Sequence, residues 1–146
     1  MPGRTLLSAA VAAVIACSAS ATGAAAHTMQ PLYYRLGGYD SILAVVDEAI
    51  KNIAADRRIN SFFAGANIKR LRVQLANQIC MASGGPCIYS GRDMKSAHAG
   101  MNINSDHFNA LVQDLGKALN RYRVPAREQR ELVALLAPTK KDIVTR

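Results

Sequence analysis

One histidine and one methionine near the middle of the chain have the types and the spacing to hold a cofactor. Met94 and His98 are four residues apart, so on a helix their side chains lie on the same face. A neutral imidazole nitrogen is a good ligand for haem iron, and an apolar neighbour can pack against a flat macrocycle. A lone histidine on a short helix is more often a surface residue or a hydrogen-bonded core residue. The spacing alone leaves both interpretations open.

Helical segments must position this pair. The chain has 146 residues, contains no Trp and only three Phe, and is rich in Ala and Leu, which favours helices over strands. Apolar residues recur at helical spacing over 42–53, 68–79, 108–122 and 132–136. We therefore expect an all-α protein in which four helices pack two over two, with the short turn that carries His98 against one opening.

Residues at the ends of these segments are typical of helix starts and stops. Polar residues and proline suit the starts, whereas glycine and proline suit most of the stops. The predicted starts are Asp40 or Ser41, Asn67, Asn104 and Pro125, and the predicted stops or interruptions are Asp56, Gly84-Gly85-Pro86, Gly100 and Pro138.

Residues 1–26 predict a secretory signal peptide. An apolar core over 5–16 follows a short positive region and precedes a stretch of small residues. Small residues favour cleavage before His27, and a lipoprotein leader cut before Cys17 is the alternative. We therefore expect an exported domain over 27–146, periplasmic or otherwise extracytoplasmic, and anchored to a membrane only if Cys17 is lipidated.

Cysteine content and charge narrow the classes of function. Cys80 and Cys87 could pair in an oxidising compartment, which geometry and not sequence decides, and no C-x-x-C pair supports zinc or thioredoxin-like chemistry. The formal net charge of +8 suits either attraction to anions or ordinary solvated helix faces. Nucleic-acid binding is not expected, because the chain is predicted to be exported and does not interleave basic and aromatic residues.

Short motifs occur in a definite order along the chain. They are Tyr34-Arg-Leu-Gly-Gly38, Phe62-Phe-Ala-Gly65, Gly84-Gly-Pro86, Tyr89-Ser-Gly-Arg-Asp-Met94, His98 and His107-Phe108. The series resembles the truncated haemoglobins, most closely the group I globins of bacteria and protozoa, over roughly residues 31–144. The resemblance implies a two-over-two helical fold that holds haem b through one proximal histidine, the position that His98 matches.

The same resemblance implies further haem contacts. By this resemblance, the apolar contacts with the haem correspond to Phe63, Met94, Ile103 and Phe108. The residues that face the haem propionates correspond to Tyr89 and the cations Lys69 and Arg70. In a globin the haem is part of the core, so an apolar match is also compatible with simple core packing.

The gas-binding side departs from the family pattern. Ile50 and Leu75 stand where many group I globins carry a tyrosine and a glutamine, and Leu71 stands at a gate position. Gln74 and Gln78 are rotated off that line of the helix, although either could turn inward. A distal hydrogen bond stabilises bound oxygen by about 1–3 kcal/mol, so its loss predicts roughly 10- to 100-fold faster oxygen release. Bound carbon monoxide and nitric oxide are less polar and should be affected less.

The resemblance therefore implies a haem globin that reversibly binds oxygen, carbon monoxide or nitric oxide. A reductase is a possible partner of such a globin. Two alternatives are a haem enzyme, with nitric oxide dioxygenase or peroxidase-like activity, and an extracytoplasmic haem carrier. The apolar distal side argues against efficient catalysis, because dioxygenation needs retained oxygen and peroxide cleavage needs a polar acid–base group.

Overall fold

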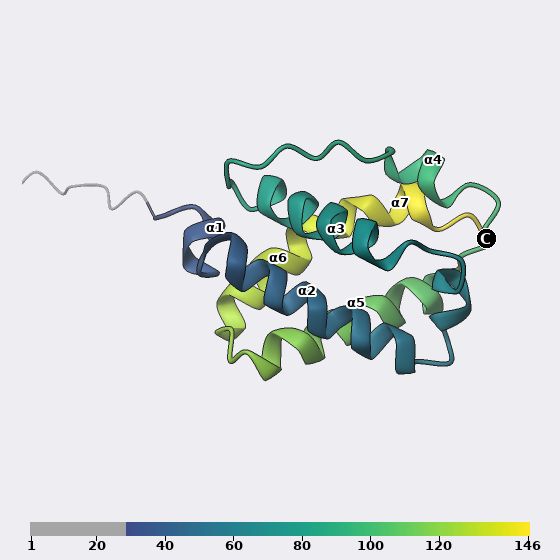
Figure 1. Ribbon diagram of the computed structural model, residues 1–146, viewed down its shortest axis with the longest axis horizontal. Coiled ribbons are helices and arrows are strands. Elements are labelled where there is room, and N and C mark those ends of the chain that lie inside the picture. The colour runs from purple at the N-terminus through teal and green to yellow at the C-terminus, as the bar shows by residue number, and fades with distance from the viewer. Residues whose placement is uncertain (1–28) are drawn as a thin grey trace, which may run out of the picture.

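The computed structural model describes residues 29–146 as a helical domain (Figure 1). The signal peptide predicted over 1–26, with both candidate cleavage sites, lies outside the described residues. No strand occurs within the described range, so the all-α prediction is confirmed. In chain order the elements are α1 (Leu32–Arg35), α2 (Gly38–Ala55), η1 (Asn60–Phe63), α3 (Ile68–Ala82), α4 (Met94–His98), α5 (Ser105–Arg121), α6 (Ala126–Leu136), η2 (Ala137–Thr139) and α7 (Lys140–Ile143).

Helix α2 begins earlier than its sequence signals indicate. Gly37 precedes it with a φ of +92°, a left-handed conformation that favours glycine. No side chain caps this end of the helix, so the prediction that Asp40 or Ser41 caps α2 is wrong. The glycine turn is the physical reason, because it reverses the chain directly from α1 into α2 before either polar residue is reached.

The other helix signals match the structure. At the start of α3, Asn67 Oδ1 accepts a hydrogen bond from the backbone N–H of Arg70 at 3.0 Å. At the start of α5, Asn104 Oδ1 accepts from the backbone N–H of His107 at 2.9 Å, and His107 Nδ1 accepts from the Asn104 N–H at 3.3 Å. Pro138 lies in η2, which separates α6 from α7 as the sequence predicts.

Two helices lie over two in the domain. Helix α2 packs against α3 and α5, and α6 contacts both α3 and α5 (Figure 1). Each of the four contributes to one buried apolar cluster, with Val46 from α2, Ala76 from α3, Leu119 from α5 and Leu132 from α6. The short α4 packs chiefly against α7, outside this cluster. Among the described helices, none has the length and apolar character needed to cross a membrane.

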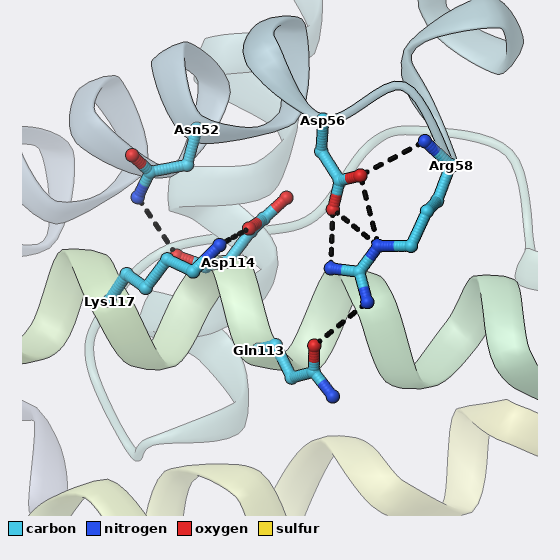
Figure 2. A network of polar contacts seen from close by, with 6 residues as sticks. All are labelled: Asn52, Asp56, Arg58, Gln113, Asp114 and Lys117. Atoms are coloured by element: carbon cyan, nitrogen blue, oxygen red, sulfur yellow. Dashed lines mark hydrogen bonds and ion pairs between the residues drawn. The ribbon is translucent and has the colours of Figure 1, made fainter.

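A polar network fixes the end of α2 to α5 (Figure 2). Asp114 is fully buried, and its backbone oxygen accepts from Asn52 Nδ2 at 3.1 Å while its carboxylate pairs with Lys117 Nζ at 2.7 Å. Hydrogen bonds from the Arg58 guanidinium hold the pKa of Asp56 well below its usual range. These contacts set the register of α2 against α5, two helices that also contribute to the cavity described below.

A disulfide joins Cys80 near the end of α3 to Cys87 in the loop that follows, with Cα atoms 5.8 Å apart. The pairing that the sequence leaves open is thus present in the structure. Residues 83–93 form no helix, and in Figure 1 this stretch runs along the outside of the domain from α3 to α4.

Candidate cofactor-binding site

A cavity of about 490 Å³ lies between α3 and α4, with further walls from α2, α5 and the C-terminal helices. Its size falls in the range of about 300–1,000 Å³ that is usual for small-molecule and cofactor pockets. Most of its lining is apolar. The lining includes Ala49 and Ile53 of α2, Phe63 of η1, Leu71, Gln74, Leu75 and Gln78 of α3, Tyr89 and Arg92 of the loop, Met94, Ala97 and His98 of α4, and Phe108, Leu111 and Val112 of α5.

His98 lines this cavity, and its own helix orients its ring. The Nδ1 atom lies 2.7 Å from the backbone oxygen of Met94, one turn earlier. Because a carbonyl oxygen only accepts hydrogen bonds, Nδ1 carries a proton, and in the tautomer with this proton alone the lone pair lies on Nε2. The start of α4 is capped by Asp93, which accepts from the Ser96 N–H at 2.9 Å; hydrogen bonds from Ser96 lower the pKa of Asp93. The site therefore presents one imidazole whose Nε2 has no hydrogen-bond partner within the described residues.

Most of the residues expected from the sequence meet in this one cavity. The residues brought together are His98, Phe63, Leu71, Leu75, Tyr89, Met94 and Phe108. Arg70 does not line the cavity and is exposed at the start of α3. The contact expected between Arg70 and a cofactor stays a prediction that the shape of the cavity does not favour.

Ile103 and Ile50 line two smaller cavities that share walls with the large one. Ile103 borders a cavity of about 60 Å³, together with Phe63, His98 and Phe108. Ile50 borders another of about 390 Å³, together with Phe63. Neither isoleucine is among the residues that line the main cavity, so their contact with a cofactor stays a prediction.

Two glutamines bring polar groups to the α3 wall. Gln74 and Gln78 both line the cavity beside Leu71 and Leu75. Gln78 Nε2 donates to the sulfur of Met94 at 3.4 Å, whereas Gln74 Oε1 is buried without a hydrogen-bond partner. The expectation of an apolar distal wall thus holds for Leu71 and Leu75 only. Helical spacing rotates the glutamines off that line, but their long side chains still reach the cavity.

Arg92 brings a cation to the lining of the cavity, which the sequence did not predict. The Tyr89 hydroxyl donates to the backbone oxygen of Arg92 at 2.7 Å, and Gly91 leaves room for the tyrosine ring beside it. Arg92 lies inside the Tyr89–Met94 motif, so a signal was present in the sequence. Sequence reasoning also missed lining residues whose place depends on how distant helices meet α4, namely Phe62, Met101, Leu111, Val112, Leu115, Leu136, Thr139 and Ile143.

Comparisons with known proteins agree with one another. The sequence model of the family described as bacterial-like globin matches residues 31–145. The chain is 32% identical to group 1 truncated hemoglobin GlbN of Mycolicibacterium paratuberculosis over 114 residues, covering 78% of this chain and 84% of that protein. It is similar in structure to truncated hemoglobin from Tetrahymena pyriformis in the Fe(III) form, with a TM-score of 0.77 and 31% identity over 80% of this chain and 100% of that one.

A second match in sequence comes from the same protozoan genus. The group 1 truncated hemoglobin of Tetrahymena thermophila is 31% identical over 111 residues, which cover 76% of this chain and 92% of that protein. The range 31–145, which the family model matches, contains the cavity and α4.

Proposed function

Because this chain belongs to the bacterial-like globin family, has the fold of the truncated haemoglobins and takes haem iron as its cofactor, we propose that it reversibly binds diatomic gases at a haem held by His98. The observation that carries the proposal is the His98 ring, which lines the cavity with Nε2 free. Haem iron, when bound, supplies the metal centre at which a diatomic gas coordinates.

The residues of the cavity fit this cofactor. Its mostly apolar lining suits a flat macrocycle, and the bond from Nδ1 to the Met94 carbonyl fixes the tautomer that a metal-ligating histidine needs. The buried, unpartnered Oε1 of Gln74 is a polar atom for which the protein alone provides no donor. This oxygen only accepts hydrogen bonds, so the fit of the cavity to haem rests on His98 and on the apolar lining.

The α3 wall supports weak retention of oxygen. Leu71 and Leu75 present apolar side chains to the cavity and offer no hydrogen bond to a polar ligand. The amide of Gln78 is already engaged with Met94, which leaves Gln74 as the polar side chain of this wall with an unsatisfied atom. Carbon monoxide and nitric oxide, which rely less on a distal donor, are the gases that such a wall favours relative to oxygen.

Gas binding fits this wall better than catalysis does. Peroxide cleavage requires a side chain that can give and take a proton, and a glutamine amide does not titrate. We therefore propose that His98 would hold the haem iron, with Leu71 and Leu75 as apolar walls on the side of the gas. Arg92 is placed to pair with the propionates, an exposed contact worth about 0–1 kcal/mol.

We also propose that the protein is exported. The observation in support is the Cys80–Cys87 disulfide, because disulfides persist mainly in oxidising compartments. Expression of the full chain in a bacterium, followed by cell fractionation and intact mass, tests this directly. Mature protein that begins at His27 in the periplasm is expected, and protein retained in the cytoplasm with its first residues intact would contradict the proposal.

The absorption spectrum of the purified protein tests the proposed function. After haem is supplied, spectra are recorded for the oxidised, reduced and carbon monoxide forms of the wild type and of His98→Ala. A reduced five-coordinate spectrum that shifts with carbon monoxide is expected for the wild type, and its loss is expected in the variant. A wild type that stays colourless, or a variant with an unchanged Soret band, would overturn the proposal.

A further inference from the structure

The Cys80–Cys87 disulfide lies at the start of the segment 86–93, which contributes to the cavity wall and leads into α4. We propose that this disulfide holds the segment 86–93 closed over the cofactor, so that the paired cysteines set how slowly haem leaves. The inference rests on the proposed function, because it concerns retention of haem in the same cavity. It goes further in assigning a positioning role to two residues that do not line that cavity.

The segment has few other attachments. No backbone–backbone hydrogen bond involves residues 86–92 in the described structure. The Tyr89 hydroxyl bonds to the Arg92 carbonyl, which is a contact within the segment, and Ile88 is 79% exposed. A stretch with exposed side chains and no backbone hydrogen bonds opens at little cost in free energy. A covalent bond at its beginning is therefore the strongest restraint on its position.

The disulfide connects this weakly held segment to the rigid core. Cys80 is completely buried in the main apolar cluster of the domain, and Cys87 packs against the same cluster. The Gly85 N–H donates to the Cys80 carbonyl at 2.8 Å. A Cβ atom on Gly85 would lie only 2.6 Å from Cys80 Sγ, so glycine is needed for the chain to fold back onto the bond. The disulfide thus attaches Cys87, which lies at the start of the segment 86–93, to the buried Cys80.

The restrained segment supplies the cavity wall and then continues into α4. Tyr89 follows Cys87 by two residues, and Tyr89 and Arg92 both line the cavity. Helix α4, with His98, comes next along the chain and packs chiefly against α7. Without the disulfide, the wall would be held mainly from its α4 end. Opening of that wall would uncover one side of the cavity and let haem leave faster.

Cys87→Ser is the variant that tests this role, because it removes the bond and leaves Cys80 in its buried place. Ile88→Ser is the matched control, since it adds the same polar side chain next door but keeps the disulfide. Haem loss is measured by transfer from the ferric protein to excess apomyoglobin. We expect roughly 10- to 100-fold faster loss from Cys87→Ser, the range that corresponds to the stabilisation by a disulfide that closes so short a loop. Ile88→Ser should match the wild type.

Limited trypsin digestion of the same full-length chains provides a second measurement that does not depend on haem. Arg92 and Lys95 are exposed cleavage sites at the end of the segment and in α4, and Arg123 between α5 and α6 is an internal reference. In Cys87→Ser we expect cleavage after Arg92 and Lys95 to accelerate about tenfold relative to cleavage after Arg123. General unfolding would instead accelerate all three cleavages together.

The two measurements separate the possible failures. Faster haem loss with selective cleavage at the segment supports the inference. Haem loss at the wild-type rate in Cys87→Ser overturns it, as does acceleration of all cleavages equally. A wild-type chain that takes up no haem overturns the proposed function and this inference with it.

Discussion

Four side chains on the inner face of α3 determine the polarity of the cavity wall. Leu71 and Leu75 are apolar. The amide nitrogen of Gln78 donates a hydrogen bond to the sulfur of Met94, and the side-chain oxygen of Gln74 is buried without a partner. The leucines and the glutamines alternate along one helix, so single substitutions can exchange their roles without a change in the backbone.

Replacing Leu75 by glutamine should slow the release of oxygen. The new amide can donate a hydrogen bond to the partly negative ligand, which is worth about 1–3 kcal/mol and predicts roughly 10- to 100-fold slower dissociation. Stopped-flow measurement of oxygen and carbon monoxide dissociation checks this, with Leu75→Met as the control of similar volume. Oxygen leaving Leu75→Gln as fast as the wild type would contradict the role given to this residue.

Replacing Gln74 by methionine should stabilise the haem-free protein. The substitution removes a buried acceptor without a partner, whose desolvation costs about 1–3 kcal/mol, and keeps a similar side-chain volume. Urea denaturation of the haem-free chain measures the free energy of unfolding. Gln78→Met is the comparison, because it removes an amide that has a partner, and it should not stabilise. A less stable Gln74→Met would show that the oxygen finds a partner in solution.

Local capping explains why most of the helices could be predicted from the sequence. Asn67 and Asn104 satisfy backbone N–H groups at the starts of α3 and α5 through nearby residues, so their signals are complete within four positions. The start of α2 was missed because Gly37 begins it through backbone conformation, which the polar residues that follow obscure. The sequence could not decide whether Cys80 and Cys87 form a disulfide, because their pairing depends on where the chain runs after Gly85.

Asn104→Ala should destabilise the domain through α5. The variant loses the hydrogen bond from the His107 N–H to the Asn104 side chain, whereas the bond from the backbone N–H of residue 104 to His107 Nδ1 does not need the asparagine side chain. The loss of an N-cap costs about 0.5–2 kcal/mol. Thermal or urea unfolding of the variant provides the measurement. Asn104→Asp, which keeps the acceptor, should retain most of the stability, and equal losses in the two variants would argue against the cap.

Ion pairs connect the first helix of the described domain to a helix near its C-terminal end. Arg35 of α1 binds Glu128 of α6 at 2.8 Å and Glu131 of the same helix at 2.5 Å. The bond to Arg35 lowers the pKa of Glu128, so this carboxyl stabilises the fold while it is charged. That contribution is present above the pKa of the unfolded carboxyl, about 4.3, and disappears as the pH falls through the lower pKa of the folded state.

Glu128→Gln should therefore be less stable than the wild type at neutral pH, and the difference should shrink as the pH falls below about 4.3. Urea denaturation over a pH series measures both values. Glu131→Gln, at a more exposed position, should show a smaller effect at every pH. A difference that is constant with pH would contradict the assignment to the Glu128 charge.

Tertiary packing accounts for what the sequence could not predict about the cavity. Motifs carried by one helix or loop, such as Met94 with His98, were sufficient to find residues that meet at the site. Ile50 and Ile103 line smaller cavities instead, and each of these shares Phe63 with the lining of the main cavity. The place of Gln74 and of Arg92 in the cavity lining depends on how the loop crosses α3, which no local spacing records.

Resonance Raman spectroscopy of the reduced, haem-loaded protein tests whether one imidazole holds the iron. The wild type should show an iron–histidine stretching band that is absent from His98→Gly and returns when free imidazole is added. His107→Gln is the control, since glutamine also suits the third position of a capping box and should leave the band in place. A band that persists in His98→Gly, or one that disappears in His107→Gln alone, would show that His98 is not the ligand.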